Sequence, residues 1–164
     1  MVYIGLDNGV SGSIGIITPN RVRFELTPHF SQQDYVKVKR NVTRVSYRGL
    51  YQILAPYRGE QVAVVIEQPM VNNMLFRATI SAVRAAECSQ IVLETLGFPI
   101  NEWVVSKTWQ KLLLPDGTKG EATKTASVDV GCRLFPQHSD AIRKHKDADG
   151  LLLAEYCRRT YGRD

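Results

Sequence analysis

Short apolar runs separated by turn residues fill the first 26 positions of the chain. One apolar run at 2–6 and another at 14–18 flank a Gly/Ser-rich stretch at 8–13, which predicts a β-hairpin. Apolar and charged residues alternate over 21–26, as in a strand with one buried face. The pattern therefore predicts three antiparallel strands at the start of the chain.

Helical and strand patterns alternate over the middle of the chain. Apolar positions at helical spacing predict a short helix at 46–56 and a long one at 77–96. The β-branched run 62–66 is apolar on both faces, which is typical of a strand in the middle of a sheet, and a second buried strand is predicted at 101–105. The polar, basic segment 28–47 shows neither helical nor strand periodicity, and we interpret it as a mobile loop.

The C-terminal part is predicted to be helical. Ser106 is a candidate N-cap for a helix that begins at the next residue, and a second helix is expected at 121–134. The Pro/Gly/Lys stretch 115–120 between them is interpreted as a flexible insertion. A last helix carries the apolar residues 151–154. Together these elements describe a mixed sheet with helices packed on its faces.

Composition and charge narrow the class of protein. The chain has 164 residues, so 1–164 are expected to form one domain. Its composition, with 44% hydrophobic and 23% charged residues, excludes a disordered chain. A net charge of +5 favours a polyanionic partner. Three cysteines without CxxC spacing indicate a reducing compartment. With no secretory leader and no stretch near the ~20 apolar residues of a membrane span, we expect a cytoplasmic protein with no membrane partner.

Acidic residues stand at the ends of the predicted elements. Asp7 follows the first strand, Glu67 follows the central strand, and Asp147 and Asp149 open the last helix. An acid at the end of an apolar strand is partly desolvated, which is costly unless a cation or a donor compensates. Carboxylates are ligands that Mg²⁺ prefers, and two ions ~3.5–4 Å apart can stabilise both the attacking and the leaving oxygen of a phosphodiester displacement.

Each acid also has an ordinary structural interpretation. Asp7 before Asn8-Gly9 could be a turn residue, and Glu67 could be a solvated strand end. Asp149 could be a helix N-terminal acid that the helix dipole favours. The acids together are more informative than any one of them.

Several sequence segments share their order and spacing with a known family. They are residues 4–9 (IGLDNG), 65–69 (VIEQP), 106–111 (SKTWQK), Lys124 with 134–136 (LFP), and 144–154 (KHKDADGLLLA). In these segments, over nearly its whole length, the chain resembles the RuvC-type Holliday junction resolvases of the ribonuclease H-like superfamily. Its short, divergent form looks like a bacteriophage member. The resemblance implies an α/β, ribonuclease H-like fold with a mixed five-stranded sheet, three antiparallel strands followed by parallel strands, flanked by helices.

The resemblance also implies a metal site. Its catalytic acids would hold two Mg²⁺ ions, with Mn²⁺ as a substitute, and water would be the nucleophile. These metal-binding acids are Asp7, Glu67, Asp147 and Asp149.

One of these positions departs from the family pattern. The family usually has an acid or a histidine three residues before the final Asp, where this chain has Lys146. On a regular helix Asp147 would point almost opposite Asp149, whereas His145 would share its face. We prefer Asp147, because a helix that begins only there leaves its side chain free to turn inward. His145 is the alternative ligand.

Basic and aromatic residues are candidates for contacts with DNA. The family has basic residues near Lys107 and Lys124 close to its active site, where a cation could steady charge on the phosphorus, so both are predicted to be catalytic. Phe76 lies where the family has an aromatic that stacks on an unpaired base, although it could instead begin the core face of the long helix. The predicted DNA-binding residues are Lys37, Lys39, Arg40, Phe76, Arg77, Lys107, Lys111, Lys119 and Lys124.

The resemblance implies a metal-dependent, structure-selective endonuclease that resolves Holliday junctions and other branched DNA by paired hydrolysis of phosphodiester bonds. It would act as a homodimer on four-way or branched DNA, with the dimer contact on the small-residue-rich helix near 78–96 and without a nucleotide cofactor.

Three alternatives stay open. The chain could be another ribonuclease H-fold nuclease that cuts RNA–DNA hybrids or flaps, or a DNA-binding module without turnover. An actin-like ATPase-type domain is suggested by Asp7-Asn8-Gly9 followed by Ser11-Gly12-Ser13, but that fold needs two such domains.

Overall fold

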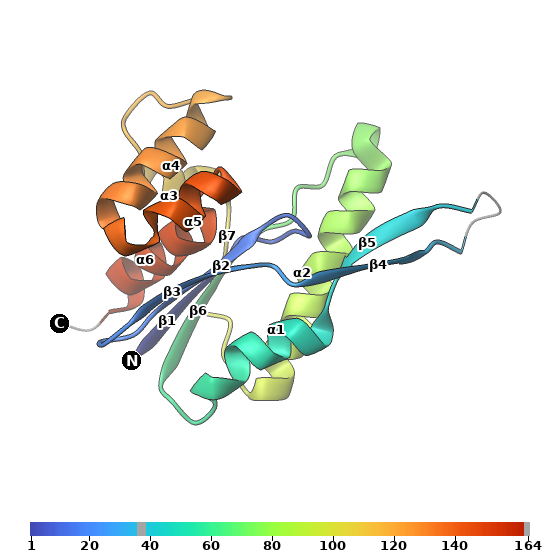
Figure 1. Ribbon diagram of the computed structural model, residues 1–164, viewed down its shortest axis with the longest axis horizontal. Coiled ribbons are helices and arrows are strands. Elements are labelled where there is room, and N and C mark those ends of the chain that lie inside the picture. The colour runs from blue at the N-terminus through green and yellow to red at the C-terminus, as the bar shows by residue number, and fades with distance from the viewer. Residues whose placement is uncertain (36–38, 163–164) are drawn as a thin grey trace.

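The computed structural model describes residues 1–35 and 39–162 and is built around a mixed five-stranded sheet (Figure 1). The strands are β1 (Val2–Leu6), β2 (Ser13–Ile17), β3 (Val22–Leu26), β6 (Val62–Glu67) and β7 (Glu102–Val104), in the order β3-β2-β1-β6-β7. The first three pair antiparallel, and β6 and β7 continue the sheet in parallel with β1. This arrangement confirms the predicted α/β, ribonuclease H-like fold.

Helices cover both faces of the sheet (Figure 1). They are α1 (Tyr47–Leu54), α2 (Phe76–Leu96), α3 (Ser106–Leu113), α4 (Ala122–Leu134), α5 (Ser139–His145) and α6 (Asp149–Tyr161), with short 3₁₀ turns η1 (Ala55–Tyr57), η2 (Asn73–Leu75) and η3 (Pro136–His138). The hydrophobic core is accordingly divided into two clusters, one under α1 and α2 and one under α3 to α6. Val64 and Val65 of β6 belong to different clusters, so this central strand is buried on both faces, as its apolar run predicts.

Helix α6 lies unusually close to β1 and β2 because glycines face it. Gly5 and Gly15 are cross-strand partners. A Cβ added to Gly5 would be 2.1 Å from the Ala154 backbone nitrogen, and one added to Gly15 would be 2.3 Å from the Gly150 carbonyl oxygen. A Cβ on Gly150 would in turn be 2.5 Å from the Ser13 carbonyl carbon. The missing side chains let the start of α6 rest directly on the sheet, beside the end of β1.

The segment 28–47, predicted to be a mobile loop, folds as an antiparallel hairpin of β4 (His29–Gln33) and β5 (Asn41–Val45), which projects from the molecule beside α2 (Figure 1). The prediction was wrong because the hairpin is held by backbone pairing while most of its side chains are exposed, so little hydrophobic period marks it. Val45 is buried under α2 and attaches the hairpin to the core.

Two local expectations also need correction. Ser106 is the first residue of α3 rather than its N-cap, which is Val105 and makes no side-chain capping bond. The short helix α5 was not predicted, and it ends at Lys146, whose φ of 73° is left-handed. In the described residues, none of the helices combines the length and the apolar character needed to cross a membrane.

Candidate metal centre

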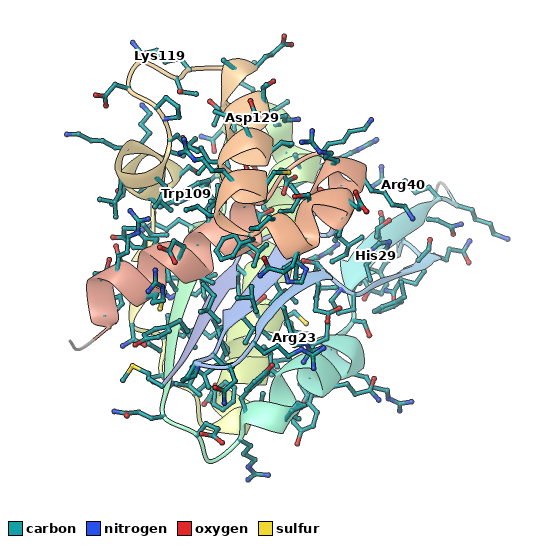
Figure 2. All side chains as sticks on the ribbon, turned by 60° about the vertical axis from the view of Figure 1, so that its left-hand side comes forward. Arg23, His29, Arg40, Trp109, Lys119 and Asp129 are labelled. Atoms are coloured by element: carbon teal, nitrogen blue, oxygen red, sulfur yellow. The ribbon has the colours of Figure 1, made fainter. Side chains whose placement is uncertain are left out.

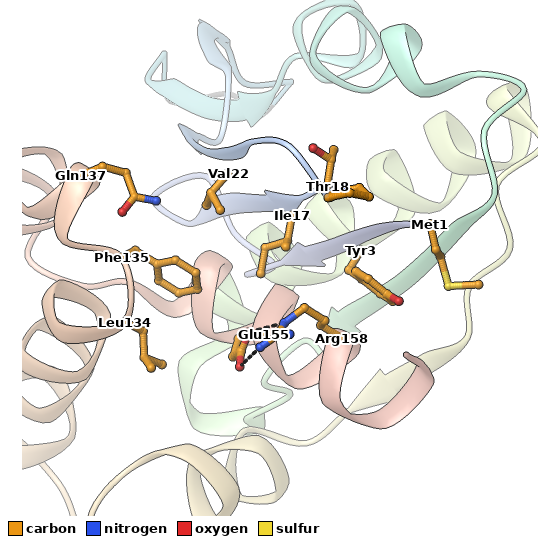
Figure 3. A pocket seen from close by; sticks show the side chains of 11 residues that line it. Met1, Tyr3, Ile17, Thr18, Val22, Leu134, Phe135, Gln137, Glu155 and Arg158 are labelled. Carbon is orange, nitrogen blue, oxygen red and sulfur yellow. Dashed lines mark hydrogen bonds and ion pairs between the residues drawn. The ribbon is translucent and has the colours of Figure 1, made fainter. Parts of the chain in front are cut away.

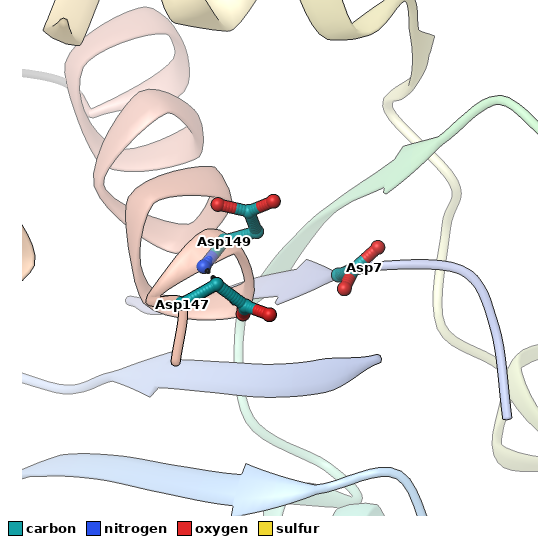
Figure 4. Close-up of side chains that lie close together, drawn as sticks. All are labelled: Asp7, Asp147 and Asp149. Carbon is teal, nitrogen blue, oxygen red and sulfur yellow. Dashed lines mark hydrogen bonds between the residues drawn. The ribbon is translucent and has the colours of Figure 1, made fainter. Parts of the chain in front are cut away.

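Three carboxylates from distant parts of the sequence meet at the end of β1 (Figure 4). Asp7 directly follows β1, Asp147 lies in the link between α5 and α6, and Asp149 is the first residue of α6. Each of them offers one oxygen that lies within 4.8 Å of the other two. We call these three residues the acid cluster.

The start of α6 is fixed by side chains that satisfy its free backbone N–H groups. The N–H of Ala148 donates to Ser127 Oγ at 3.0 Å, and the N–H of Gly150 donates to Ser13 Oγ at 3.0 Å. Between them, the N–H of Asp149 donates to Asp147 Oδ1 at 3.3 Å. Because the first N–H groups of a helix have no partner within it, these three bonds hold the acid-bearing turn in one position.

Ser127 of α4 also contacts the acid cluster directly. Its Oγ donates to Asp149 Oδ1 at 2.5 Å, and only 1% of the residue is exposed. Sequence analysis missed this residue. The available signal was its spacing, because Ser127 shares the buried face of α4 with Val130 and Gly131, and a hydroxyl at such a position needs a partner.

The structure explains how Asp147 joins the cluster despite its unusual spacing. Lys146 ends α5 in a left-handed conformation, and α6 begins only at Asp149, so Asp147 is not constrained by a helix. Its carboxylate belongs to the cluster, as the sequence argument preferred. His145 instead contacts Asp147, with its Nε2 3.3 Å from Oδ1 of that residue. The His145 ring also packs edge-on against Phe24.

Glu67 lies beside the acid cluster at the end of β6. Its carboxylate raises the pKa of Asp7. Its Oε1 accepts a hydrogen bond from Trp109 Nε1 at 3.4 Å, which ties it to the fully buried ring of α3. Glu67 is therefore a neighbour of Asp7, and among the described residues the group whose oxygens meet within 4.8 Å consists of the three aspartates.

Burial and mutual repulsion raise the pKa values of the carboxylates in the acid cluster. Burial raises the pKa of Asp7 well above its usual range, and the carboxylates of Asp149, Glu67 and Asp147 raise it further. Burial raises the pKa of Asp149 to about 7, although the Ser127 hydrogen bond and Lys124 act in the opposite direction. Such crowded, partly desolvated carboxylates are costly unless a cation compensates them. The donor set consists of hard carboxylate oxygens, which fits Mg²⁺ or Mn²⁺.

The pKa of Asp147 is also raised, but several neighbouring groups act in the opposite direction. Burial raises its pKa, whereas His145, the backbone N–H of Asp149 and Lys124 lower it. Lys124 is thus the basic residue, among those predicted to be catalytic, whose charge acts on the cluster.

The other predicted lysines with described positions lie on α3, on the loop that follows it and on the hairpin. Lys107, Lys111 and Lys119 line a cavity of about 490 Å³ between α3 and the loop that leads to α4. Figure 2 shows Lys119 at the tip of that loop, well away from the sheet, and Arg40 on the hairpin. Lys39 is exposed on the hairpin, and Lys37 lies outside the described residues.

Phe76 begins α2 and is 69% exposed, so it does not belong to the core face of that helix. Arg77 follows it at the surface. The neighbouring Met74 and Leu75 are exposed as well, so several apolar side chains protrude after β6.

A second pocket, of about 400 Å³, lies at the other end of the sheet (Figure 3). It is lined by Tyr3, Phe135 and Glu155 among others. The buried Glu155 carboxylate is already paired with Arg158 and Arg159 at 2.8 and 2.7 Å. This pocket therefore has its charge satisfied internally, unlike the acid cluster.

Comparison with known proteins finds solved structures with a similar fold. No protein-family model and no curated protein matches the chain. Among solved structures, the chain is similar to T. thermophilus RuvC in complex with a Holliday junction substrate, with a TM-score of 0.55 and 14% identity over 99% of this chain and 96% of that one. A second Thermus thermophilus RuvC structure gives a TM-score of 0.53 and 13% identity over 99% and 97%. At this identity the similarity establishes a RuvC-like fold.

Proposed function

We propose that the protein is a metal-dependent endonuclease that resolves Holliday junctions and other branched DNA by paired hydrolysis of phosphodiester bonds. The observation that carries the proposal is the convergence of Asp7, Asp147 and Asp149 within 4.8 Å at the end of β1, on a RuvC-like fold. The fold is similar over nearly its full length to a protein solved with a Holliday junction, which favours branched DNA over an RNA–DNA hybrid or a flap as the substrate.

In the proposed mechanism the acid cluster and Glu67 would hold two Mg²⁺ ions, which Mn²⁺ could replace. Bound divalent ions lower the pKa of water and stabilise the attacking and leaving oxygens of the displacement. Ser127 keeps the Asp149 carboxylate in place, and His145 keeps that of Asp147. Lys124 adds positive charge beside both acids, which favours the approach of a phosphate. Lys107 is proposed to assist the same step from α3.

Paired cleavage requires two active sites, and we propose a homodimer that uses α2. On this helix Val83 and Ile91 are exposed, and they line a groove of about 470 Å³ with Phe30 of β4. An exposed apolar stripe of this kind is typical of a surface that another chain covers. A two-fold protein would match a two-fold junction. We further propose a bacteriophage origin and action in the cytoplasm of the bacterial host.

The decisive experiment compares Asp7→Asn with Asp129→Asn on a mobile four-way junction while Mg²⁺ is titrated. Asp129 is an exposed acid of α4 outside the acid cluster, so its variant is the charge-matched control. Asp7→Asn should abolish cutting and keep or tighten junction binding, because less negative charge then faces the phosphates. The control and the wild type should produce symmetric pairs of nicks.

Two results would contradict the proposal. One is an equal loss of cutting and binding in Asp7→Asn, and the other is the absence of metal-dependent nicks in the wild type. Parallel assays on an RNA–DNA hybrid and a flap rank the other nuclease activities of this fold.

A further inference from the structure

The β4–β5 hairpin and the start of α2 enclose a groove of about 580 Å³, which we call the hairpin groove. Tyr35 lies on its hairpin side and Phe76 on its α2 side. These side chains are 77% and 69% exposed, so two aromatic rings border one open groove. The function proposed above does not use Tyr35.

The charge of the hairpin groove is predominantly positive. Arg40, Arg77 and Arg84 line it, and Asp34 is the acid among its lining residues. Asp34 is already engaged, because its Oδ2 accepts hydrogen bonds from Arg40 Nε and Nη2 at 2.9 and 2.7 Å. Among the described residues, Arg77 and Arg84 of α2 form no hydrogen bond or ion pair, although the charge of Arg84 helps to lower the pKa of Asp34. Both guanidinium groups can therefore meet an anion from outside.

The Tyr35 ring is held in place by a neighbouring strand. Arg44 of β5 donates from Nη2 to the Tyr35 hydroxyl at 2.9 Å, and its guanidinium carbon lies 5.4 Å from the ring centroid. A ring fixed on one side and open on the other is suited to stacking against a flat ligand.

Exposed aromatic rings beside arginines are the usual surface for unpaired nucleotides, whose bases stack on the rings while their phosphates contact the cations. An apolar protein segment would cover such rings but would leave the arginine charges without partners. We propose that the hairpin groove binds unpaired nucleotides of a DNA strand, with Tyr35 and Phe76 stacking on bases and Arg77 and Arg84 contacting phosphates.

This inference rests on the proposed function for its choice of DNA as the polyanion. The resemblance to the resolvases implies stacking only for Phe76. The structure adds the groove, the second ring and Arg84.

The test measures binding of a fluorescent 15-nucleotide oligothymidine and of a blunt duplex of the same length. Tyr35→Ala should weaken oligothymidine binding about fivefold to a hundredfold, since stacking on a base is lost, and should leave duplex binding unchanged. Tyr35→Phe keeps the ring and should bind like the wild type. Leu26→Ala removes an exposed apolar side chain of β3, outside the groove, and serves as the control.

The phosphate contact is tested by the salt dependence of the same binding. Arg84→Gln should reduce the slope of log affinity against log salt by about 0.7 for the single strand. Arg58→Gln removes the same charge from an exposed position outside the groove and should have no such effect.

The outcomes separate this inference from the proposed function. If Tyr35→Ala binds oligothymidine like the wild type, or if the wild type does not bind it, the inference is wrong even when junctions are cut. If binding depends on Tyr35 but no branched DNA is cut with Mg²⁺, the inference stands and the proposed nuclease activity does not.

Discussion

The acid cluster and the hairpin groove both carry charged side chains, but the protein holds them in different surroundings. Around Asp149, buried serines, backbone N–H groups and glycine contacts restrict every neighbour. Around Tyr35, the side chains are exposed and the hairpin joins the core mainly through Val45. The difference indicates that the cluster is adapted to place charges accurately, whereas the groove is adapted to bind a ligand without contributing much to stability.

The largest expected effect concerns the pH dependence of stability without metal. The pKa of Asp149 rises from 3.8 to about 7 in the folded protein, so its contribution to stability is fully present below the unfolded value and is lost as pH rises through about 7. Asp7 acts in the same direction. At about 1.4 kcal/mol per pKa unit, Asp149 contributes at most about 4 kcal/mol. Urea unfolding in EDTA at about pH 4 and pH 8 measures the loss.

Mg²⁺ should restore the lost stability at the higher pH, because it binds the folded state. Asp149→Asn should flatten the pH profile, and Asp129→Asn should not. If the stability of the wild type without metal did not change with pH, the carboxylates would not be crowded. In the hairpin groove the pH dependence of stability has the opposite sign. The hydrogen bond from Arg40 lowers the pKa of Asp34, so the stability that this pair contributes is lost as pH falls.

The second effect tests whether the close approach of α6 sets the cluster. Gly15→Ala places a Cβ 2.3 Å from the Gly150 carbonyl oxygen and should destabilise the fold by about 3 kcal/mol or more, with loss of metal binding. Gly9→Ala is the control, because its Cβ would lie 4.0 Å from the Gly12 backbone nitrogen. Thermal unfolding and Mn²⁺ calorimetry measure both variants. Equal stability of the two would refute the packing argument.

The third effect isolates the role of Ser127. Ser127→Ala removes the donor to Asp149 and the acceptor for the Ala148 N–H, and should lower metal affinity about tenfold to a hundredfold. In the wild type this hydrogen bond lowers the pKa of Asp149. Its loss should therefore raise that pKa and move the pH profile of cleavage to higher pH. Thr125→Ala, at an exposed position of the same helix, is the control. An unchanged pH profile would limit Ser127 to a structural role.

The smallest effect on stability is expected at the groove. Phe76→Ala should weaken junction binding by about 1–3 kcal/mol and leave the thermal midpoint unchanged, because the ring is largely exposed. Phe76→Trp should retain binding, whereas Phe76→Leu, which keeps the apolar character, should not. A lowered midpoint for Phe76→Ala would mean that the ring stabilises the fold.

The local patterns were sufficient for the sheet and most helices. The run 62–66 is apolar on both faces because β6 lies between two helical layers, and this burial is visible in the residues themselves. The hairpin of β4 and β5 left no such signal, because backbone pairing stabilises it while its side chains remain exposed. A segment without a buried face could not be distinguished from a loop by its periodicity.

The sequence by itself determined that Asp7, Glu67, Asp147 and Asp149 stand at the ends of elements, because strand ends and helix starts are local features. Only the tertiary structure decided which of these acids meet, which serine holds them and which aromatic ring faces Phe76 across the groove. The reason is that these contacts join residues that are distant in the sequence, from 22 positions for Ser127 and Asp149 to 137 for Ser13 and Gly150. Their distances depend on how closely α6 approaches the sheet, which is set by packing against glycines rather than by any local pattern.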